Sequence, residues 1–359
     1  MHEERVNTLL VHPDFLLLYV PGDGAKMKLV KPSSDVYHRE RIMQGTSTWY
    51  ALSHLWGTSK ADPHLWSEIG LYVDDEHGQA AEPIPMRDEK RNTLLNLLKN
   101  YPDSYWWIDV LCARTDTPLD IMGTIYACCT LCVAMIDCDP RLIQHINSVS
   151  RIPEEVEWMS AQYVNQPNQL RSAIHTLTEC AWWSRVWTWQ EIVLPHQVAL
   201  MAETTTDFSS HGYVDVEFLI SPYHDTPNAL RDVKTGRGLK NLASFIGNNS
   251  GHPGTPLSIM LELYTLFYTL GKSSRRCMDP VDYVYGVLGV LQLDIPRMTD
   301  PDTVWQSFLS QLEKLIVRIK SSVNLKKRSN TTVDARAWNV DLRTAQSMAD
   351  VYRYIAPMH

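Results

Sequence analysis

Three short apolar runs stand out in the first 140 residues, at 49–56 (WYALSHLW), 105–112 (YWWIDVLC) and 130–137 (TLCVAMID). Each is apolar almost throughout and does not alternate with polar residues, which is the pattern of a strand buried on both faces. Helical periodicity separates the runs, at 87–102 and 117–126. Strands that alternate with helices in this way predict an α/β fold, a mostly parallel sheet with helices on both faces.

The second half of the chain has longer helical patterns. Clear apolar periodicity covers 255–271, 283–291 and 302–320. Thr255-Pro256 and Asp279-Pro280 each place a capping side chain before a proline, as at the start of a helix. We therefore expect a largely helical C-terminal region packed on the α/β core.

These patterns divide the 359 residues into four expected segments. They are a lead segment at 1–44, the α/β core at 45–195, an extension at 196–300, and a C-terminal helix with a polar tail at 301–359.

The densest aromatic stretch is 179–195, ECAWWSRVWTWQEIVLP. On a single helix with about 3.6 residues per turn, Trp182 and Trp189 share one side, and Trp187 precedes Glu191 by one turn. Burial beside such an aromatic wall would raise the pKa of the Glu191 carboxyl and suit it to chemistry. The alternative, which the pattern alone favours, is an amphipathic helix whose Glu191 is solvated.

Composition narrows the class of protein. The apolar share of 44% and the charged share of 21% are those of a globular chain. The net charge of −8 argues against a nucleic-acid binder, and the one basic run, 318–328, is typical of a solvated surface. No apolar run approaches the roughly 18 residues of a membrane span, and we expect no secretory signal.

The seven cysteines suit reduced thiols in a cytoplasmic protein better than a disulfide framework. Cys129 and Cys132 match the C-x-x-C spacing, but no second pair stands at zinc-ligand distance. We expect buried thiols here, with no metal and no bound cofactor.

Five ordered blocks resemble the fungal heterokaryon-incompatibility (HET) domain: WYALSHLWG, YWWIDVLC, MGTIYACCTLCVAMID, WWSRVWTWQE and RRCMDPVDYVYGVLGV. The resemblance covers 46–195 well and continues more thinly to about 292. The family is associated with allorecognition and programmed cell death. Its fold is thought to be related to Toll/interleukin-1 receptor (TIR) domains, some of which cleave NAD.

The resemblance implies a site. TIR-type enzymes carry an essential Glu on a helix in a W-x-x-x-E context, which here is Trp187 to Glu191. NAD is then a possible substrate, and the tryptophans would wall a nucleotide cleft. One block departs from the family, because Cys112-Ala113-Arg114-Thr115 replaces C-I-x-Q and lacks the usual Gln.

Ligands of open α/β sheets bind beyond the carboxyl ends of the strands. That rule places Ser53, His54 and Trp56 at one rim together with Asp109 and Cys112. If the helix of Glu191 lines the same rim, its carboxylate would hold the ribose hydroxyls and stabilise an oxocarbenium-like cation. Trp56 or Trp187 would stack on the base.

Each of these residues also has a structural interpretation. Asp109 would cap the following turn or pair with Arg185. The sequence favours this structural role and a ligand role equally. We favour a structural pairing for Arg185. Ser53 would bond backbone at the strand end, and Trp56 is expected in the core more than as a stacking platform.

Two further functions stay open. In one, Cys112 is a nucleophile with His54 as base and Asp109 as orienter, although buried thiols are usually inert. In the other, the chain is a non-enzymatic signalling module that self-associates, and its cleft is vestigial. Exposed aromatic side chains would supply a homo-oligomer interface in either an enzyme or a module.

Overall fold

The computed structural model describes residues 2–44, 49–56, 58–59, 62–114, 117–150, 166–221, 227–246, 255–326 and 341–355. These residues separate into two compact units. The first comprises residues 1–184 and 195–227, and the second comprises 185–194 and 228–359.

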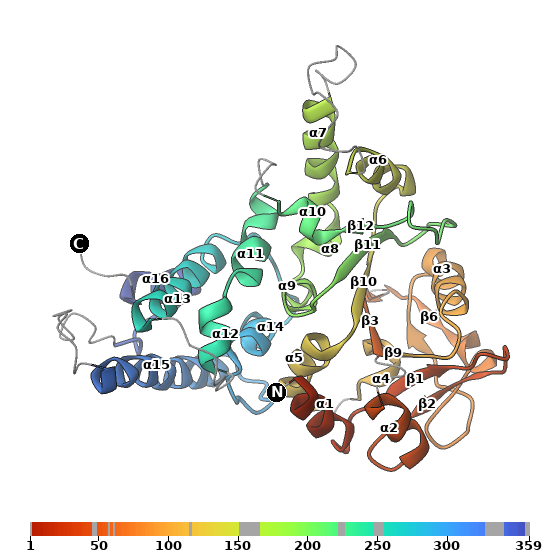
Figure 1. Ribbon diagram of the computed structural model, residues 1–359, viewed down its shortest axis with the longest axis horizontal. Coiled ribbons are helices and arrows are strands. Elements are labelled where there is room, and N and C mark those ends of the chain that lie inside the picture. Colours follow the sequence, from red (N-terminus) through yellow and green to blue (C-terminus); the bar gives the residue numbers. More distant parts are fainter. Residues whose placement is uncertain are drawn as a thin grey trace. The chain divides into compact units, whose positions relative to one another are not determined.

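The first unit is built on an eight-stranded sheet with the order β12-β11-β10-β3-β9-β1-β2-β7 (Figure 1). The strands are β1 Leu17–Val20, β2 Met27–Val30, β3 Trp49–His54, β7 Val73–Asp74, β9 Ser104–Ile108, β10 Leu131–Ile136, β11 Val198–Ala202 and β12 Val214–Asp215. The neighbours β11, β10, β3 and β9 are all parallel, and β12, β1 and β2 join by antiparallel pairs. The mostly parallel α/β fold is confirmed.

The three apolar runs lie side by side in this sheet. Ala51 of β3 is level with Trp107 of β9 on one side and with Cys132 of β10 on the other. All five residues of β9 are buried, and so are five of the six in both β3 and β10. Burial on both faces explains why these runs do not alternate with polar residues.

Helices flank the sheet, and two very small sheets accompany it. The helices of this unit are α1 His2–Leu10, α2 Val36–Met43, α3 Asp88–Lys99, α4 Asp109–Cys112, α5 Leu119–Cys128, α6 Pro140–Ser150, α7 Gln166–Thr178, α8 Ala181–Ser184 and α10 Val216–Leu219, with a 3-10 helix η1 at Ser67–Leu71. The short strands β4 Thr58–Ser59 with β5 Asp62–Pro63, and β6 Leu65–Trp66 with β8 Ile84–Pro85, form the small sheets. β1 and β2 come from the expected lead segment, so the sheet extends beyond the 45–195 core.

The second apolar run is a strand only as far as Ile108. Asp109 to Cys112 form the one-turn helix α4, where a continuous strand was expected. The reason is local: Asp109 Oδ1 accepts the Val110 backbone N–H at 2.7 Å, a bond that competes with a strand ladder.

The second unit is helical in the residues that the structure describes. It contains α9 Trp187–Val193, α11 Asn228–Arg237, α12 Lys240–Ile246, α13 Pro256–Leu270, α14 Asp282–Leu291, α15 Pro301–Lys326 and α16 Met348–Ile355. The expected helical C-terminal region is confirmed. Most of the basic run 318–328 lies on α15, while residues 327 and 328 lie outside the described residues.

The tryptophan-rich stretch is not the single helix that its periodicity predicts. Helix α8 ends at Ser184, and α9 begins at Trp187. Between them Arg185 forms an isolated parallel β-bridge with Arg276, and the Val186 N–H donates to Arg276 O at 3.0 Å. That amide is therefore taken by another chain segment and cannot bond within a continuous helix.

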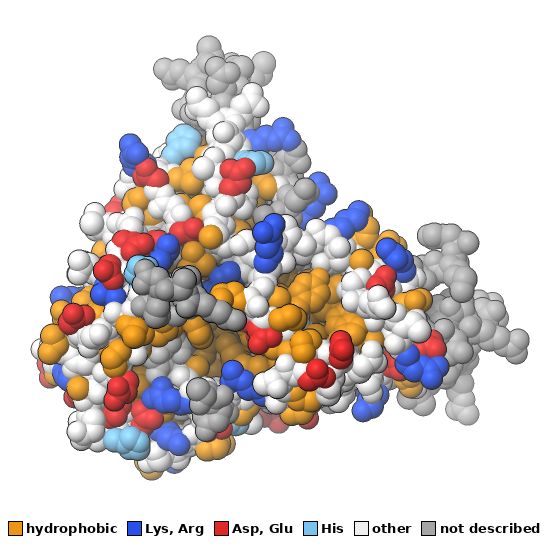
Figure 2. Space-filling view, turned by 180° about the vertical axis from the view of Figure 1, so that it is seen from behind, with side chains coloured by type: hydrophobic (Ala, Val, Ile, Leu, Met, Phe, Trp, Pro, Cys, Tyr) orange, Lys and Arg blue, Asp and Glu red, His pale blue; other side chains and the backbone are white. Residues whose placement is uncertain are grey.

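Surface properties agree with the composition. On the face shown in Figure 2, Lys and Arg side chains are interspersed with Asp and Glu, and no broad basic field is visible. None of the helices in the described ranges has a stretch long and apolar enough to cross a membrane.

The packing of β3 yields a stability prediction. Leu52 is fully buried and is level with Ile108 and Val133 of the flanking strands. Leu52→Ala should lower the free energy of unfolding by about 2–5 kcal/mol, because it leaves a cavity in the sheet core. Urea unfolding followed by circular dichroism measures the loss.

Leu71→Ala is the matched control. The Leu71 side chain is 72% exposed, so the same substitution there should change stability by less than about 0.5 kcal/mol. Equal losses at Leu52 and Leu71 would contradict the placement of β3 in the core.

Candidate functional site

Four parallel strands end at one edge of the sheet, and each is followed or closed by a polar side chain. His54 closes β3, Asp109 follows β9, Asp137 follows β10 and Glu203 follows β11. His54, Asp109 and Glu203 are 1%, 8% and 4% exposed. Polar groups gathered at the carboxyl edge of parallel strands are the usual setting of a ligand site.

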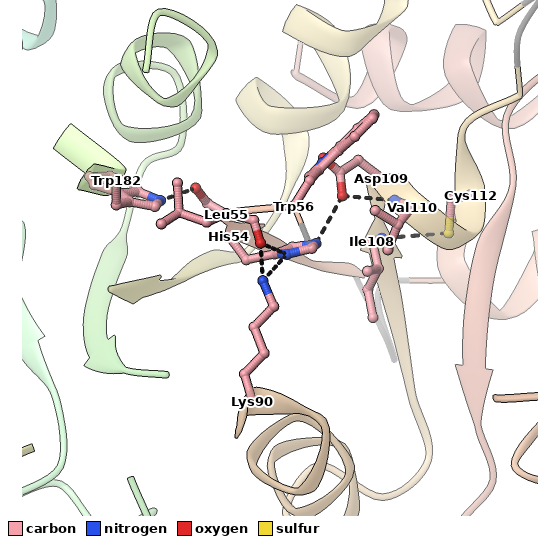
Figure 3. Close-up of polar contacts among 10 residues, drawn as sticks. His54, Leu55, Trp56, Lys90, Ile108, Asp109, Val110, Cys112 and Trp182 are labelled. Carbon is pink, nitrogen blue, oxygen red and sulfur yellow. Dashed lines mark hydrogen bonds and ion pairs between the residues drawn. The ribbon is translucent and has the colours of Figure 1, made fainter. Parts of the chain in front are cut away.

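A chain of polar contacts runs through this edge (Figure 3). Lys90 Nζ lies 2.8 Å from His54 Nδ1, and His54 Nε2 lies 3.0 Å from Asp109 Oδ1. The Trp56 indole N–H donates to Asp109 Oδ2. Lys90 also donates to Leu55 O. This series of contacts thus connects the buried ammonium of Lys90 on α3 with the indole of Trp56 at the edge of the sheet.

Protonation of His54 follows from these neighbours. Burial is the main cause that lowers the pKa of His54, and the positive charge of Lys90 lowers it further against the opposing effect of Asp109. The neutral ring accepts from Lys90 at Nδ1 and donates from Nε2 to the Asp109 carboxylate. His54 Nδ1 also lies 3.0 Å from Leu55 O, and the contacts at both ring nitrogens fix the orientation of the imidazole.

Trp56 is not in the core, contrary to the expectation from its apolar run. Its side chain is 43% exposed, and Asp109 holds its indole nitrogen. An aromatic ring with one edge bonded and its surface open is suited to stacking. Gly57, the next residue in the expected rim loop, lies outside the described residues.

Both oxygens of Asp109 are engaged. Oδ1 accepts from His54 and from the Val110 amide, and Oδ2 accepts from Trp56. The bond to Val110 is made inside α4, whose N-cap residue is Ile108, so the turn-capping role expected for Asp109 stays a prediction. The alternative pairing with Arg185 stays a prediction.

Ser53 is held by the tryptophan segment. Its Oγ accepts from the Trp182 indole at 3.0 Å, and the side chain is buried. Asp137 in turn accepts the Ala181 and Trp182 backbone amides, both at 3.0 Å. These bonds fix α8 at the ends of β3 and β10. The backbone bond expected for Ser53 stays a prediction.

Lys90 is a residue that the sequence interpretation missed. It lies one turn before Leu94 and about two turns before Leu97 on α3, so it occupies the apolar stripe and is fully buried. The periodicity of the helix already places Lys90 within the apolar stripe. An ionisable residue at such a position must find polar partners inside the protein, and this signal could have identified it.

Glu203 and Arg87 were also missed. The Glu203 carboxylate pairs with the Arg87 guanidinium, and burial raises the pKa of Glu203 although Arg87 and Lys90 oppose that shift. Within the described chain, Glu203 Oε2 and Arg87 Nε have no hydrogen-bond partner. The segment after residue 196 gave no clear pattern, so its strand β11 and the carboxylate behind it were not recognised.

Cys112 has the contacts of a structural thiol. Its Sγ lies 3.7 Å from Trp106 O and 3.5 Å from the Ile108 amide nitrogen, and burial raises the pKa of the thiol to about 12. A thiol protonated at neutral pH is a poor nucleophile. These observations argue against the Cys112 nucleophile with His54 as its base.

Glu191 lies on α9 in the second unit and is only 4% exposed. The interpretation of a solvated carboxylate is therefore wrong. The neighbouring Gln190 is 1% exposed, and its Nε2 has no hydrogen-bond partner within the described part of the chain. A buried unsatisfied amide costs about 1–3 kcal/mol, and a functional role is one of the reasons for which such a group is retained.

Trp187 and Arg185 also belong to the second unit. The Trp187 indole donates to Asp282; burial raises the pKa of Asp282, and this bond and the charge of Arg185 oppose the shift. Arg185 thus contributes to the charge balance of its own unit. The convergence of Ser53 and Asp109 with Glu191 stays a prediction, because the two sets lie in separate units.

Across the described ranges, no three His, Cys, Asp or Glu side chains are grouped as metal ligands. All seven cysteines are free thiols.

Residues 49–191 match the family model named Heterokaryon incompatibility protein (HET). This segment is therefore a HET domain, and the match supports a function of the heterokaryon-incompatibility type. No curated protein and no solved structure matches the chain. The matched range contains every sequence-predicted site residue from Ser53 to Glu191, and it ends inside α9.

The buried His54 yields a pH prediction. Its pKa is lowered in the folded chain, so below the unfolded value of about 6.5 the unfolded chain binds a proton that the native chain does not. Its contribution to stability is complete above that pH and is lost as the pH falls. Between pH 6.5 and pH 5, the free energy of unfolding should fall more steeply in the wild type than in His54→Gln. The difference in slope should be up to about 1.4 kcal/mol per pH unit.

Urea unfolding of both proteins at several pH values gives the two slopes. The pKa of His38 is also lowered by burial, and because this residue is present in both proteins its effect cancels in the comparison. Parallel slopes for wild type and His54→Gln would show that His54 is not held neutral.

Proposed function

We propose that this HET-domain chain cleaves the nicotinamide–ribose bond of an NAD-like nucleotide in the cytoplasm, with Glu191 as the essential carboxylate and a TIR-like core. The burial of Glu191 beside the unsatisfied amide of Gln190 is the observation that carries the proposal. A carboxylate within a soluble protein's interior, in a tryptophan-lined helix, has the environment in which functional carboxylates are found.

The proposed reaction breaks the bond between ribose C1′ and the pyridinium nitrogen, and water supplies the oxygen that replaces it. Nicotinamide leaves with the bonding electrons, and positive charge develops on the ribose ring. The Glu191 carboxylate stabilises that charge and accepts hydrogen bonds from the ribose hydroxyls. No metal or bound cofactor takes part in this reaction.

The carboxyl edge of the sheet supplies binding in this proposal. Trp56 presents an open ring, and the buried chain of Lys90, His54 and Asp109 holds its indole in one orientation. A ring fixed before binding loses little entropy when a base stacks on it. In the same proposal Ser53 and Cys112 support this binding surface from inside the first unit, and Trp187 of the second unit is a further ring on which a base stacks.

A non-enzymatic, self-associating signalling module is the second candidate. It is favoured by the block at 112–115, where the family's Gln is absent. The Arg114 side chain of that block already has partners within the protein, because its guanidinium donates to Leu111 O and pairs with Glu76 at 2.7 Å. Thr115, which stands in place of the Gln, lies outside the described residues.

Glu191→Gln separates the two candidates. The substitution keeps the side-chain shape and removes the charge, so nicotinamide release from NAD should fall by about 10²–10³-fold while the melting temperature changes little. Glu262→Gln is the control in the same unit, since Glu262 accepts the Asn241 and Leu242 amides in a structural role.

Other outcomes have definite meanings. A Glu191→Gln protein that unfolds makes Glu191 structural, and one that stays folded and fully active removes it from the chemistry. A wild type that never releases nicotinamide but self-associates in light scattering would establish the module in place of the enzyme.

Trp56→Leu tests the stacking surface. Loss of one base–aromatic stack costs about 1–3 kcal/mol, so KM for NAD should rise roughly 10-fold or more with a smaller change in kcat. Tyr37→Leu is the control, because Tyr37 is 63% exposed in the same unit and away from the carboxyl edge. An unchanged KM in Trp56→Leu would exclude stacking.

A further inference from the structure

Helix α9, which carries Glu191, has only seven residues. An isolated helix of that length is unstable in water, because helix nucleation costs more than so few hydrogen bonds return. The position of the Glu191 carboxylate is therefore set by what α9 packs against. Those contacts lie in the second unit, at residues beyond the end of the HET match.

Arg275 makes the principal polar contacts with the start of α9. Its Nη1 donates to Arg185 O at 3.0 Å and to Thr188 Oγ1 at 2.9 Å. Thr188 Oγ1 itself donates to Arg185 O at 2.9 Å, so the three groups close a small network. One guanidinium thus bonds a residue two positions before α9 and the second residue of that helix.

The guanidinium is itself held rigidly. Arg275 is 8% exposed, and its Nε donates to Asp232 Oδ2 at 2.8 Å. Ser273 Oγ donates to the same oxygen at 2.8 Å. A planar, paired and buried guanidinium has a fixed direction, which a flexible lysine ammonium lacks.

Close packing holds both ends of α9. A Cβ on Gly286 of α14 would lie 2.9 Å from Val186 Cγ2, and one on Gly236 of α11 would lie 2.7 Å from Val193 Cγ1. Arg237 Nη1 donates to Ile192 O at 2.8 Å near the helix end. The residues that hold α9 therefore come from α11, α14 and the segment between α13 and α14.

We propose that Arg275 is a positioning residue for Glu191, and that the functional HET domain extends beyond residue 191 to the end of α14. The guanidinium fixes the first turn of α9 and thereby the direction in which the carboxylate one turn later points. Its effect on catalysis rests on the proposed function, whereas its effect on α9 does not.

Arg275→Lys is the test. It retains a positive charge for Asp232, so no carboxylate is left buried and unpaired, but it removes the fork that bonds Arg185 O and Thr188. Arg231→Lys is the matched control, because Arg231 is exposed on α11 directly beside Asp232. Thr188→Val removes the same contact from the α9 side with little change in volume.

Two measurements are made on the 359-residue chain. Arg275→Lys should lower kcat for nicotinamide release about 10- to 100-fold with KM nearly unchanged, as expected when a supporting residue is lost. Hydrogen exchange of the α9 amides should become faster in Arg275→Lys and in Thr188→Val, but not in Arg231→Lys. Combining Arg275→Lys with Thr188→Val should add little, because both remove one shared contact.

The outcomes distinguish this inference from the proposed function. If α9 exchange is the same in Arg275→Lys as in the wild type, Arg275 does not position the helix. If α9 exchange rises but kcat stays at the wild-type value, Arg275 stabilises the helix without positioning Glu191 for catalysis, and the inference fails. If the wild type releases no nicotinamide, the proposed function fails. Faster exchange in Arg275→Lys and Thr188→Val would still show that Arg275 holds α9 in the second unit.

Discussion

Burial of the central strands on both faces is the constraint on which the rest of the first unit depends. Parallel strands that are apolar throughout place their first polar residues together, at the edge where the chain leaves the sheet. His54, Asp109 and Glu203 gather there for that reason. Charged groups in such a place need partners inside the protein, and Lys90 and Arg87 of the α3 region supply them.

The same principle explains how two tryptophans are held. Asp109 accepts the Trp56 indole in the first unit, and Asp282 accepts the Trp187 indole in the second. Each carboxylate stands at the start of a helix, α4 or α14, and each ring keeps part of its surface uncovered. A ring whose indole nitrogen is bonded to a carboxylate is held in one orientation, which suits a binding surface.

The family match and the compact units do not share a boundary. The match ends at residue 191, whereas the second unit takes residues 185–194 together with 228–359. The block that contains Arg275, Asp282 and Gly286 contacts the end of the matched segment. Residues beyond the end of the family match therefore hold α9, the helix in which that match ends.

Much of the fold was determined by the sequence itself. Continuous apolar runs predicted β3, β9 and β10, and helical periodicity predicted α3, α5, α13, α14 and α15, since both patterns depend only on which side chains must leave water. The pattern also placed His54 and Asp109 at one rim, because the carboxyl ends of parallel strands share an edge.

Only the tertiary structure decided the rest. The periodicity of the tryptophan stretch predicted one helix, but Arg276 takes the Val186 amide and divides it. Trp56 is exposed and Glu191 is buried, the reverse of what their local patterns favoured. Burial of one side chain depends on neighbours that arrive from distant segments, such as Arg275 for α9 and Lys90 for His54, and no local pattern contains them.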